Sequence, residues 1–167
     1  MPTRPSDIKN PGSYIGFGWQ NRTTDDLETV REWWKRWPDA GIALHPGPSG
    51  FLVFDPDLPD NVPDWLQKHF DTALFRPTDE IDSKRGHRFF SLAQGQRFGC
   101  GLGKLKPPKA EKWGEVKCFG GVVIVGPTEH PRVGGRYATG PGGNPILVPD
   151  EIAEKPMRRP IRNRIGC

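Results

Sequence analysis

The chain is organised around Phe51-Leu52-Val53-Phe54-Asp55-Pro56-Asp57, an apolar run that ends in two carboxylates. Such a run predicts a buried β-strand that opens onto a turn. Side chains two positions apart on a strand point the same way, so the oxygens of Asp55 and Asp57 can converge on one hard cation. Asp-Pro-Asp is also ordinary turn chemistry, in which the carboxylates hydrogen-bond to the nearby backbone. These residues alone leave both interpretations open.

Length and composition predict one domain with many turns. The 167 residues suffice to bury a core, and 6 Trp and 9 Phe supply large apolar side chains. The 21 Gly and 19 Pro favour short strands and loops over a helical bundle. No apolar stretch approaches the ~20 residues that cross a bilayer, so we expect no membrane partner and a cytoplasmic location.

The net charge of +4 is distributed unevenly. Acidic residues dominate positions 55–82, and basic residues dominate positions 84–117. A polyphosphate partner would suit the basic stretch. The alternative interpretation is that its lysines belong to solvated loops.

Helices are expected after residue 24 and from Pro63. Thr24 or Asp25 can cap the first, whose apolar face begins at Leu27 and whose run stops at Pro38. Its tryptophans are interpreted as core anchors and not as platforms for stacking bases. The apolar face expected for the second helix contains four residues, namely Trp65, Leu66, Phe70 and Leu74.

The remaining elements are expected to be strands. Residues 41–44 and the strand ending at Asp55 are expected to form one hairpin, and residues 113–118 and 121–125 another. Residues 86–92 alternate as a strand that places His87 and Phe89 on one face.

Taken in order, these elements resemble the prim-pol group of the archaeo-eukaryotic primase superfamily, the primase-polymerase domains of phage, plasmid and bacterial replication proteins. The resemblance covers most of the chain. It is carried by a Trp-rich helix ending in Trp37-Pro38, the Gly41-Ile42-Ala43 to Gly50 segment, Asp55-Pro56-Asp57, Gly86-His87-Arg88-Phe89-Phe90, Glu115 before Gly120-Gly121, and Gly126-Pro127-Thr128-Glu129-His130.

The resemblance implies a catalytic site. Asp55, Asp57 and Glu115 would hold catalytic Mg²⁺ or Mn²⁺ ions, and His87 would contact the phosphates of the incoming nucleotide. His130 is interpreted either as a second nucleotide contact or as a residue that fixes its loop.

Two cations are added to this site from strand spacing. Arg85 is two residues from His87, and Lys117 is two residues from Glu115, so each shares a strand face with a predicted site residue. Each is interpreted either as a partner of the triphosphate or as an ordinary surface cation.

The sequence also departs from the family pattern at two positions. Pro56 stands where an apolar residue is usual, and because proline cannot donate to a sheet ladder, this position should lie at a strand end or edge. Glu115 is longer than the Asp common at the third acidic position.

The resemblance implies an α+β fold, with an RRM-like primase-polymerase core carrying the acidic residues in a cleft and an N-terminal αβ unit. Residues 1–148 are expected to form the catalytic domain, and 149–167 a basic tail or linker, which can lead to a helicase module. The implied function is template-directed nucleotide polymerisation, as DNA primase, DNA polymerase or both, with a single-stranded DNA template and nucleoside triphosphates as partners. Two alternatives stay open: a noncatalytic module that binds single-stranded DNA or an origin, and a metal-dependent nuclease.

Overall fold

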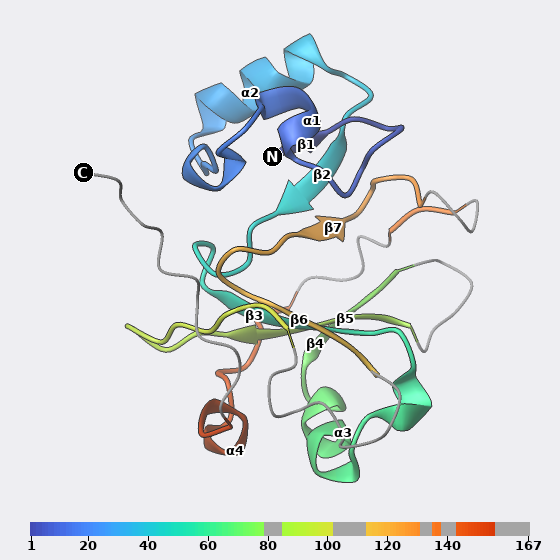
Figure 1. The fold of residues 1–167 in the computed structure, drawn as a ribbon, viewed down its shortest axis with the longest axis vertical. Coiled ribbons are helices and arrows are strands. Elements are labelled where there is room, and N and C mark those ends of the chain that lie inside the picture. The colour runs from blue at the N-terminus through green and yellow to red at the C-terminus, as the bar shows by residue number, and fades with distance from the viewer. Residues whose placement is uncertain (79–84, 102–112, 131–134, 138–142, 156–167) are drawn as a thin grey trace.

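The computed structural model describes residues 1–78, 85–101, 113–130, 135–137 and 143–155, which fold into two antiparallel sheets with helices outside them (Figure 1). The larger sheet has the order β4-β5-β3-β6, and the smaller has the order β1-β2-β7. The strands are β1 (Pro2–Thr3), β2 (Gly41–Leu44), β3 (Phe51–Pro56), β4 (Leu74–Pro77), β5 (Gly86–Ser91), β6 (Gly114–Lys117) and β7 (Val123–Val125). This arrangement confirms the predicted α+β class.

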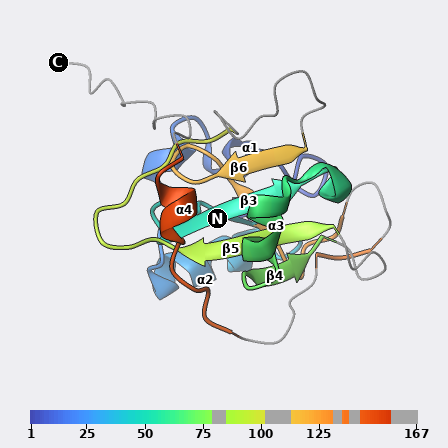
Figure 2. The ribbon, with the colours of Figure 1, turned by 90° about the horizontal axis from the view of Figure 1, so that it is seen from below.

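The helices cover the outer faces of the two sheets (Figures 1 and 2). The group on the three-stranded sheet comprises α1 (Gly12–Ile15), the 3₁₀ turn η1 (Trp19–Asn21) and α2 (Leu27–Arg36). On the four-stranded sheet lie η2 (Pro59–Asn61), α3 (Asp64–Phe70) and α4 (Asp150–Ala153). No helix in the described part of the chain is long and apolar enough to span a bilayer.

β3 is the central strand of the larger sheet, and it is buried on both faces. Leu52, Val53 and Phe54 have no exposed surface. The Phe54 ring lies 5.2 Å from Phe70 of α3 and 6.2 Å from Trp113, measured between centroids. Burial of each such side chain stabilises the fold by roughly 1.5–3 kcal/mol. The apolar run therefore forms the buried strand that its sequence predicted.

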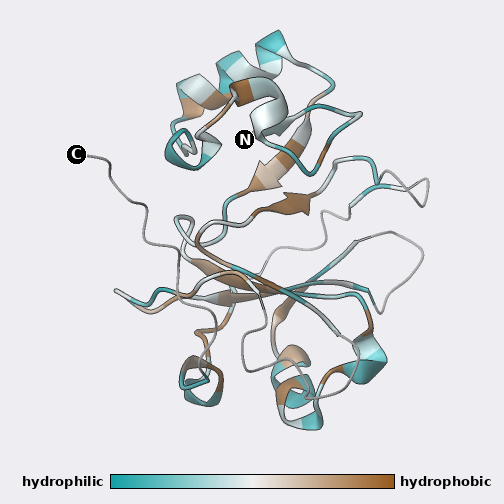
Figure 3. Cartoon of the chain, in the orientation of Figure 1, coloured by the Kyte–Doolittle hydropathy of each residue, from teal (hydrophilic) through white to brown (hydrophobic). Residues whose placement is uncertain are grey.

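Apolar clusters also join the other layers. Val53 and Phe89 of the larger sheet contact Val123 of β7, so the two sheets pack against each other through a small core. Trp33 and Trp37 pack against the cluster between the smaller sheet and its helices, which confirms Trp33 as a core residue. Figure 3 shows the result, with hydrophobic residues concentrated in the strands and hydrophilic residues on the helices.

Both predicted hairpins are wrong. β2 pairs with β1 and β7, whereas β3 pairs with β5 and β6. Each segment expected to turn back on its own sheet, residues 45–50 and 118–122, instead crosses from one sheet to the other. Short spacing between two strands predicted their proximity correctly, but it could not reveal that the edges of each strand are occupied by other partners.

The first long helix begins later than predicted. Asp26, and not Thr24 or Asp25, is its cap, because the Asp26 carboxylate accepts a hydrogen bond from the Thr29 amide at 2.8 Å. Leu27 is the first helical residue and is 65% exposed, so it does not belong to the apolar face.

The second predicted helix ends earlier than its apolar spacing suggested. α3 stops at Phe70, and Leu74 opens β4 instead of continuing the helix. Pro56 is the last residue of β3, as its missing amide predicted.

The expected boundary at residue 148 stays a prediction. Ile152 of α4, beyond that boundary, is fully buried in the core of the larger sheet. The four arginines expected in the tail lie outside the described residues.

Gly114 gives a direct test of how closely β6 must approach β3. A Cβ at this position would lie 2.3 Å from the Asp55 carbonyl oxygen and 2.7 Å from Pro56 Cα. Overpacking of this kind costs typically ~1–3 kcal/mol. We expect Gly114→Ala to lower the free energy of unfolding in urea by about 2 kcal/mol. Gly135→Ala is the matched control, because no heavy atom of a non-adjacent described residue lies within 4 Å of its Cβ position. Equal losses in the two variants would contradict this account of the sheet.

Candidate active site

One row of polar side chains crosses the four-stranded sheet. Asp55 on β3 lies opposite Glu115 on β6, and Arg76 on β4 lies opposite His87 on β5. The β3–β5 register, extended by one residue, puts Asp55 beside His87. Residues in one row of a sheet project from the same face. The row therefore carries Arg76, His87, Asp55 and Glu115 in that order, on the face that looks toward the smaller sheet.

Asp55 and His87 form the centre of the row. Their Oδ1 and Nε2 atoms are 3.7 Å apart, which is an ion-pair contact and too long for a hydrogen bond. Burial of the Asp55 carboxyl opposes its ionisation, but the polar contact and charge of His87, with the charges of Lys117 and Lys9, outweigh burial and lower the Asp55 pKa. Asp55 is therefore an anion at neutral pH and can accept a cation.

Each of the other two predicted acidic ligands also has a cationic neighbour. The Glu115 carboxylate contacts the Lys117 ammonium group. Asp57, which follows β3, lies 3.7 Å from Arg85, and both side chains are more than half exposed. Exposed ion pairs contribute only about 0–1 kcal/mol, so Asp57 can exchange its contact with Arg85 at little cost. The structure thus places Arg85 beside Asp57 and Lys117 beside Glu115, two of the three predicted acidic ligands.

The donor set at this row suits a divalent metal ion of the Mg²⁺ type. Asp55 and Glu115 are direct cross-strand partners, which places their Cβ atoms about 4.5–5.5 Å apart. Mg²⁺ in proteins is usually held by one or two carboxylates together with waters and substrate phosphates. Within the described ranges no three His, Cys, Asp or Glu side chains gather closely enough to form a complete protein cage. The residues fit a site that substrate oxygens would complete.

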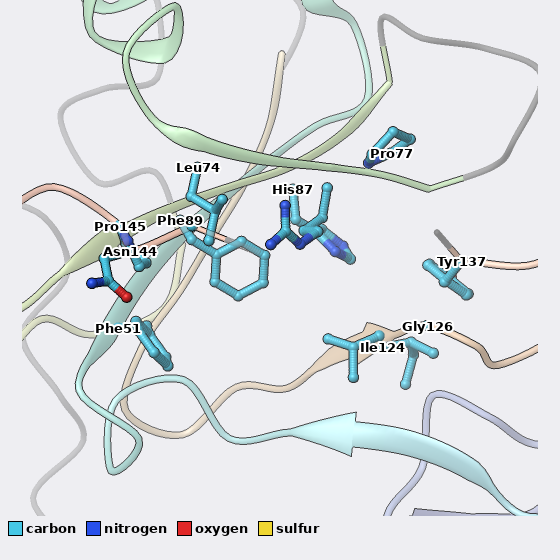
Figure 4. A pocket seen from close by; sticks show the side chains of 13 residues that line it. Phe51, Leu74, Pro77, His87, Phe89, Ile124, Gly126, Tyr137, Asn144 and Pro145 are labelled. Atoms are coloured by element: carbon cyan, nitrogen blue, oxygen red, sulfur yellow. The ribbon is translucent and has the colours of Figure 1, made fainter. Parts of the chain in front are cut away.

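A cavity of about 350 Å³ lies beside this row, between the two sheets. Figure 4 shows His87 in the middle of its wall, with Phe89 on one side and Tyr137 on the other. Arg76 and His87 provide the basic part of a lining that is otherwise mostly apolar. The volume is within the range of small-molecule sites, about 300–1,000 Å³, and Arg76 and His87 give the wall N–H donors.

His130 does not join the row directly. It lines a second cavity, of about 860 Å³, beside Trp34 and Arg136. Its ring centroid lies 5.1 Å from that of Tyr137, whose ring is nearly parallel to His87 at 6.1 Å. The Tyr137 ring therefore contacts both His130 and His87, the predicted nucleotide contact. Its backbone amide also donates to the Gly135 carbonyl, in keeping with a role in fixing its loop.

Three residues at the site had no predicted role in the sequence. Arg76 and Tyr137 line the cavity, and the charge of Lys9 acts on Asp55. Arg76 alternates with Leu74 on β4, but the assignment of Leu74 to a helix hid that strand. No local pattern marks Tyr137 or Lys9, which are brought to the site only by the fold. Much of the predicted basic stretch, Lys84 and residues 102–112, lies outside the described residues.

The effect of His87 on Asp55 can be measured directly. His87→Ala removes the contact and charge that lower the Asp55 pKa, so we expect that pKa to rise in a carboxyl ¹³C NMR titration. Because the folded pKa is below the unfolded one, the contact stabilises the fold above about pH 4, and this stabilisation is lost as the pH falls through the folded pKa. His69→Ala is the control, since His69 contacts Glu151 instead. An unchanged Asp55 pKa in His87→Ala would contradict the assigned contact.

Comparison with known families agrees with this arrangement. The family model described as bifunctional DNA primase/polymerase, N-terminal (Prim-Pol), matches residues 1–157, which include both sheets and α4. A comparison with curated proteins found no match. The family match supports a primase or polymerase type of function in replication and confirms the resemblance seen in the motifs. The chain belongs to the Prim-Pol family of bifunctional DNA primase/polymerase N-terminal domains.

Proposed function

We propose that this chain catalyses template-directed nucleotide polymerisation, as a DNA primase, a DNA polymerase or both, in the replication of phage, plasmid or bacterial DNA. One observation carries the proposal: Asp55 lies between His87 and Glu115 in a single row beside a cavity with a cationic wall. Membership of the Prim-Pol family supports it.

Nucleotide polymerisation requires metal-binding carboxylates, and this row supplies carboxylates. The 3′-hydroxyl of the growing strand attacks the α-phosphorus of a nucleoside triphosphate, a new P–O bond forms, pyrophosphate leaves and the hydroxyl proton is released. Mg²⁺ or Mn²⁺ would stabilise negative charge on the attacking and leaving oxygens. Asp55 and Glu115 are the residues that would hold the ion, with Asp57 joining them by exchanging its contact with Arg85.

The cations around the row would bind and orient the triphosphate. His87 and Arg76 present N–H donors from the cavity wall, and phosphate oxygens accept such bonds strongly. Lys117 and Arg85, which now neutralise Glu115 and Asp57, would be freed to balance the phosphates as the acids take up metal. The apolar part of the cavity would exclude water from the nucleoside.

The alternative functions fit less well. A noncatalytic DNA-binding module would gain affinity by losing acidic residues that face phosphates, yet this chain has Asp55 and Glu115 side by side in the row. A nuclease would use the same acids, but it would have no need of a nucleotide-sized cavity whose wall presents Arg76 and His87. A single-stranded DNA template and nucleoside triphosphates remain the proposed partners, and a helicase domain or subunit remains a predicted one.

Removal of one metal-ligand oxygen tests the catalytic role. Asp55→Asn keeps the shape of the side chain but removes its charge, so we expect primer extension with Mg²⁺ or Mn²⁺ to fall at least about 100-fold. The measurement sizes labelled products on a single-stranded template, with and without a primer. Asp150→Asn, an exposed carboxylate on α4, is the control and should extend normally. Normal synthesis by Asp55→Asn would exclude this site as the catalytic centre.

A second experiment separates nucleotide binding from template binding. We expect His87→Ala and Arg76→Ala each to raise the KM for nucleotide by about tenfold or more, because each removes a donor to the phosphates. Affinity for the template should change little, as measured by fluorescence anisotropy. His69→Ala serves as the matched histidine control. The assignment is wrong if both variants keep the KM of the unmodified protein.

A further inference from the structure

A second surface, separate from the candidate active site, lies where the chain crosses between the two sheets. The connections 45–50 and 118–122 run beside each other: the Gly47 amide donates to the Cys118 carbonyl at 3.2 Å, and the Gly120 amide donates to His45 Nε2 at 3.1 Å. Both connections lie in Figure 1 at the side where β2 leads into β3. Asp55 is four residues farther along β3 than Phe51, about 13 Å from this edge.

Aromatic side chains gather at this crossover edge. The Trp19 ring packs edge-on against His45 at 5.3 Å, and the Phe119 amide donates to the Phe98 carbonyl at 3.2 Å, which fixes the neighbouring loop. The Arg97 guanidinium lies over the Phe119 ring at 3.9 Å. We name the crossover strip by its five side chains, Phe17, Trp19, Arg22, Arg97 and Phe119.

Phe17 is the most exposed large apolar side chain in the described part of the chain, with 101% of its reference surface accessible. It lies between Gly16 and Gly18, both at positive φ (83° and 74°), a backbone that glycine adopts without strain. Arg22 donates to the Ile15 carbonyl and so closes the base of this loop. A single exposed phenyl ring is ordinary on a protein surface. The residues around Phe17 decide whether its ring belongs to a binding surface.

The four segments that build the strip contain no acidic residue. Asp and Glu are absent from the sequence of 11–22, 45–50, 92–101 and 118–122, whereas Arg22 and Arg97 are exposed there. An aromatic surface with arginines and without carboxylates is complementary to an anionic ligand that carries flat rings. Single-stranded nucleic acid has both features, because its bases stack on aromatic side chains and its phosphates pair with cations.

We propose that the crossover strip binds single-stranded nucleic acid, with Phe17 stacking on a base and with Arg22 and Arg97, the latter held over Phe119, pairing with the phosphate backbone. The identification of this strand as the template rests on the proposed polymerase function, but the binding itself does not. The strip lies outside the row of Asp55 and Glu115, so it would hold the strand away from the reacting atoms.

The test measures affinity for a fluorescent oligothymidylate by anisotropy, in EDTA and without nucleotide, so that no catalysis is required. Stacking of one base on an aromatic side chain is worth roughly 1–3 kcal/mol, so Phe17→Ala should weaken binding at least about fivefold. Phe17→Trp should keep the affinity, whereas Phe17→Leu should lose it, because leucine is apolar but offers no π-face. Leu27→Ala, which truncates another exposed apolar side chain, is the control and should bind normally.

Two further measurements separate stacking from charge. An abasic oligonucleotide should bind the unmodified protein and Phe17→Ala equally, since it has no base to stack. Arg97→Gln should reduce the dependence of log affinity on log salt by about 0.7, the value expected for one lost phosphate contact on a single strand.

Either of two results would overturn the proposal: unchanged affinity for oligothymidylate in Phe17→Ala, or full affinity in Phe17→Leu, which would point to an apolar protein partner instead. A different result is expected if the strip binds nucleic acid but the proposed polymerase function is wrong. In that case the unmodified protein would make no product, yet its affinity would still depend on Phe17. If both proposals hold, Asp55→Asn binds the oligonucleotide normally and does not extend it.

Discussion

The register of β3 is the constraint on which the site depends. β3 is buried on both faces, and sliding it by one residue would turn Val53 and Asp55 to the helix-covered side and expose charge to the apolar core. The hydrophobic contacts of Leu52 and Phe54 with α3 therefore fix Asp55 between His87 and Glu115. The same residues that stabilise the sheet set the geometry of the candidate chemistry.

The site is arranged as carboxylates that already have cationic neighbours. His87 lies beside Asp55, Lys117 contacts Glu115, and Arg85 faces Asp57. Without a substrate these contacts limit repulsion among the acids. Because the outer two pairs are exposed or partly exposed, their exchange for metal and phosphate costs little. One row can thus serve both the stability of the free protein and the binding of a highly charged substrate.

Local patterns predicted most of the strands and the positions of several candidate site residues along them. Alternation along residues 86–91 placed His87 and Phe89 on one face, and both residues line the cavity. Asp57 and Arg85 lie just outside β3 and β5, so their predicted shared faces with Asp55 and His87 stay predictions. The hairpins were wrong because strand pairing depends on competition for edges among all strands, which short spacings do not encode. Tyr137 escaped notice because it reaches the cavity through long-range packing, and Arg76 escaped notice because the assignment of Leu74 to a helix hid β4.

The most direct test of the central claim is the position of Mn²⁺ in a crystal grown with a nonhydrolysable nucleoside triphosphate, located by anomalous scattering. The account predicts Mn²⁺ bound by Asp55 and Glu115, with the triphosphate against His87 and Arg76 and the nucleoside in the adjoining cavity. Mn²⁺ and nucleotide bound elsewhere, with the row of Asp55 and Glu115 empty, would contradict it.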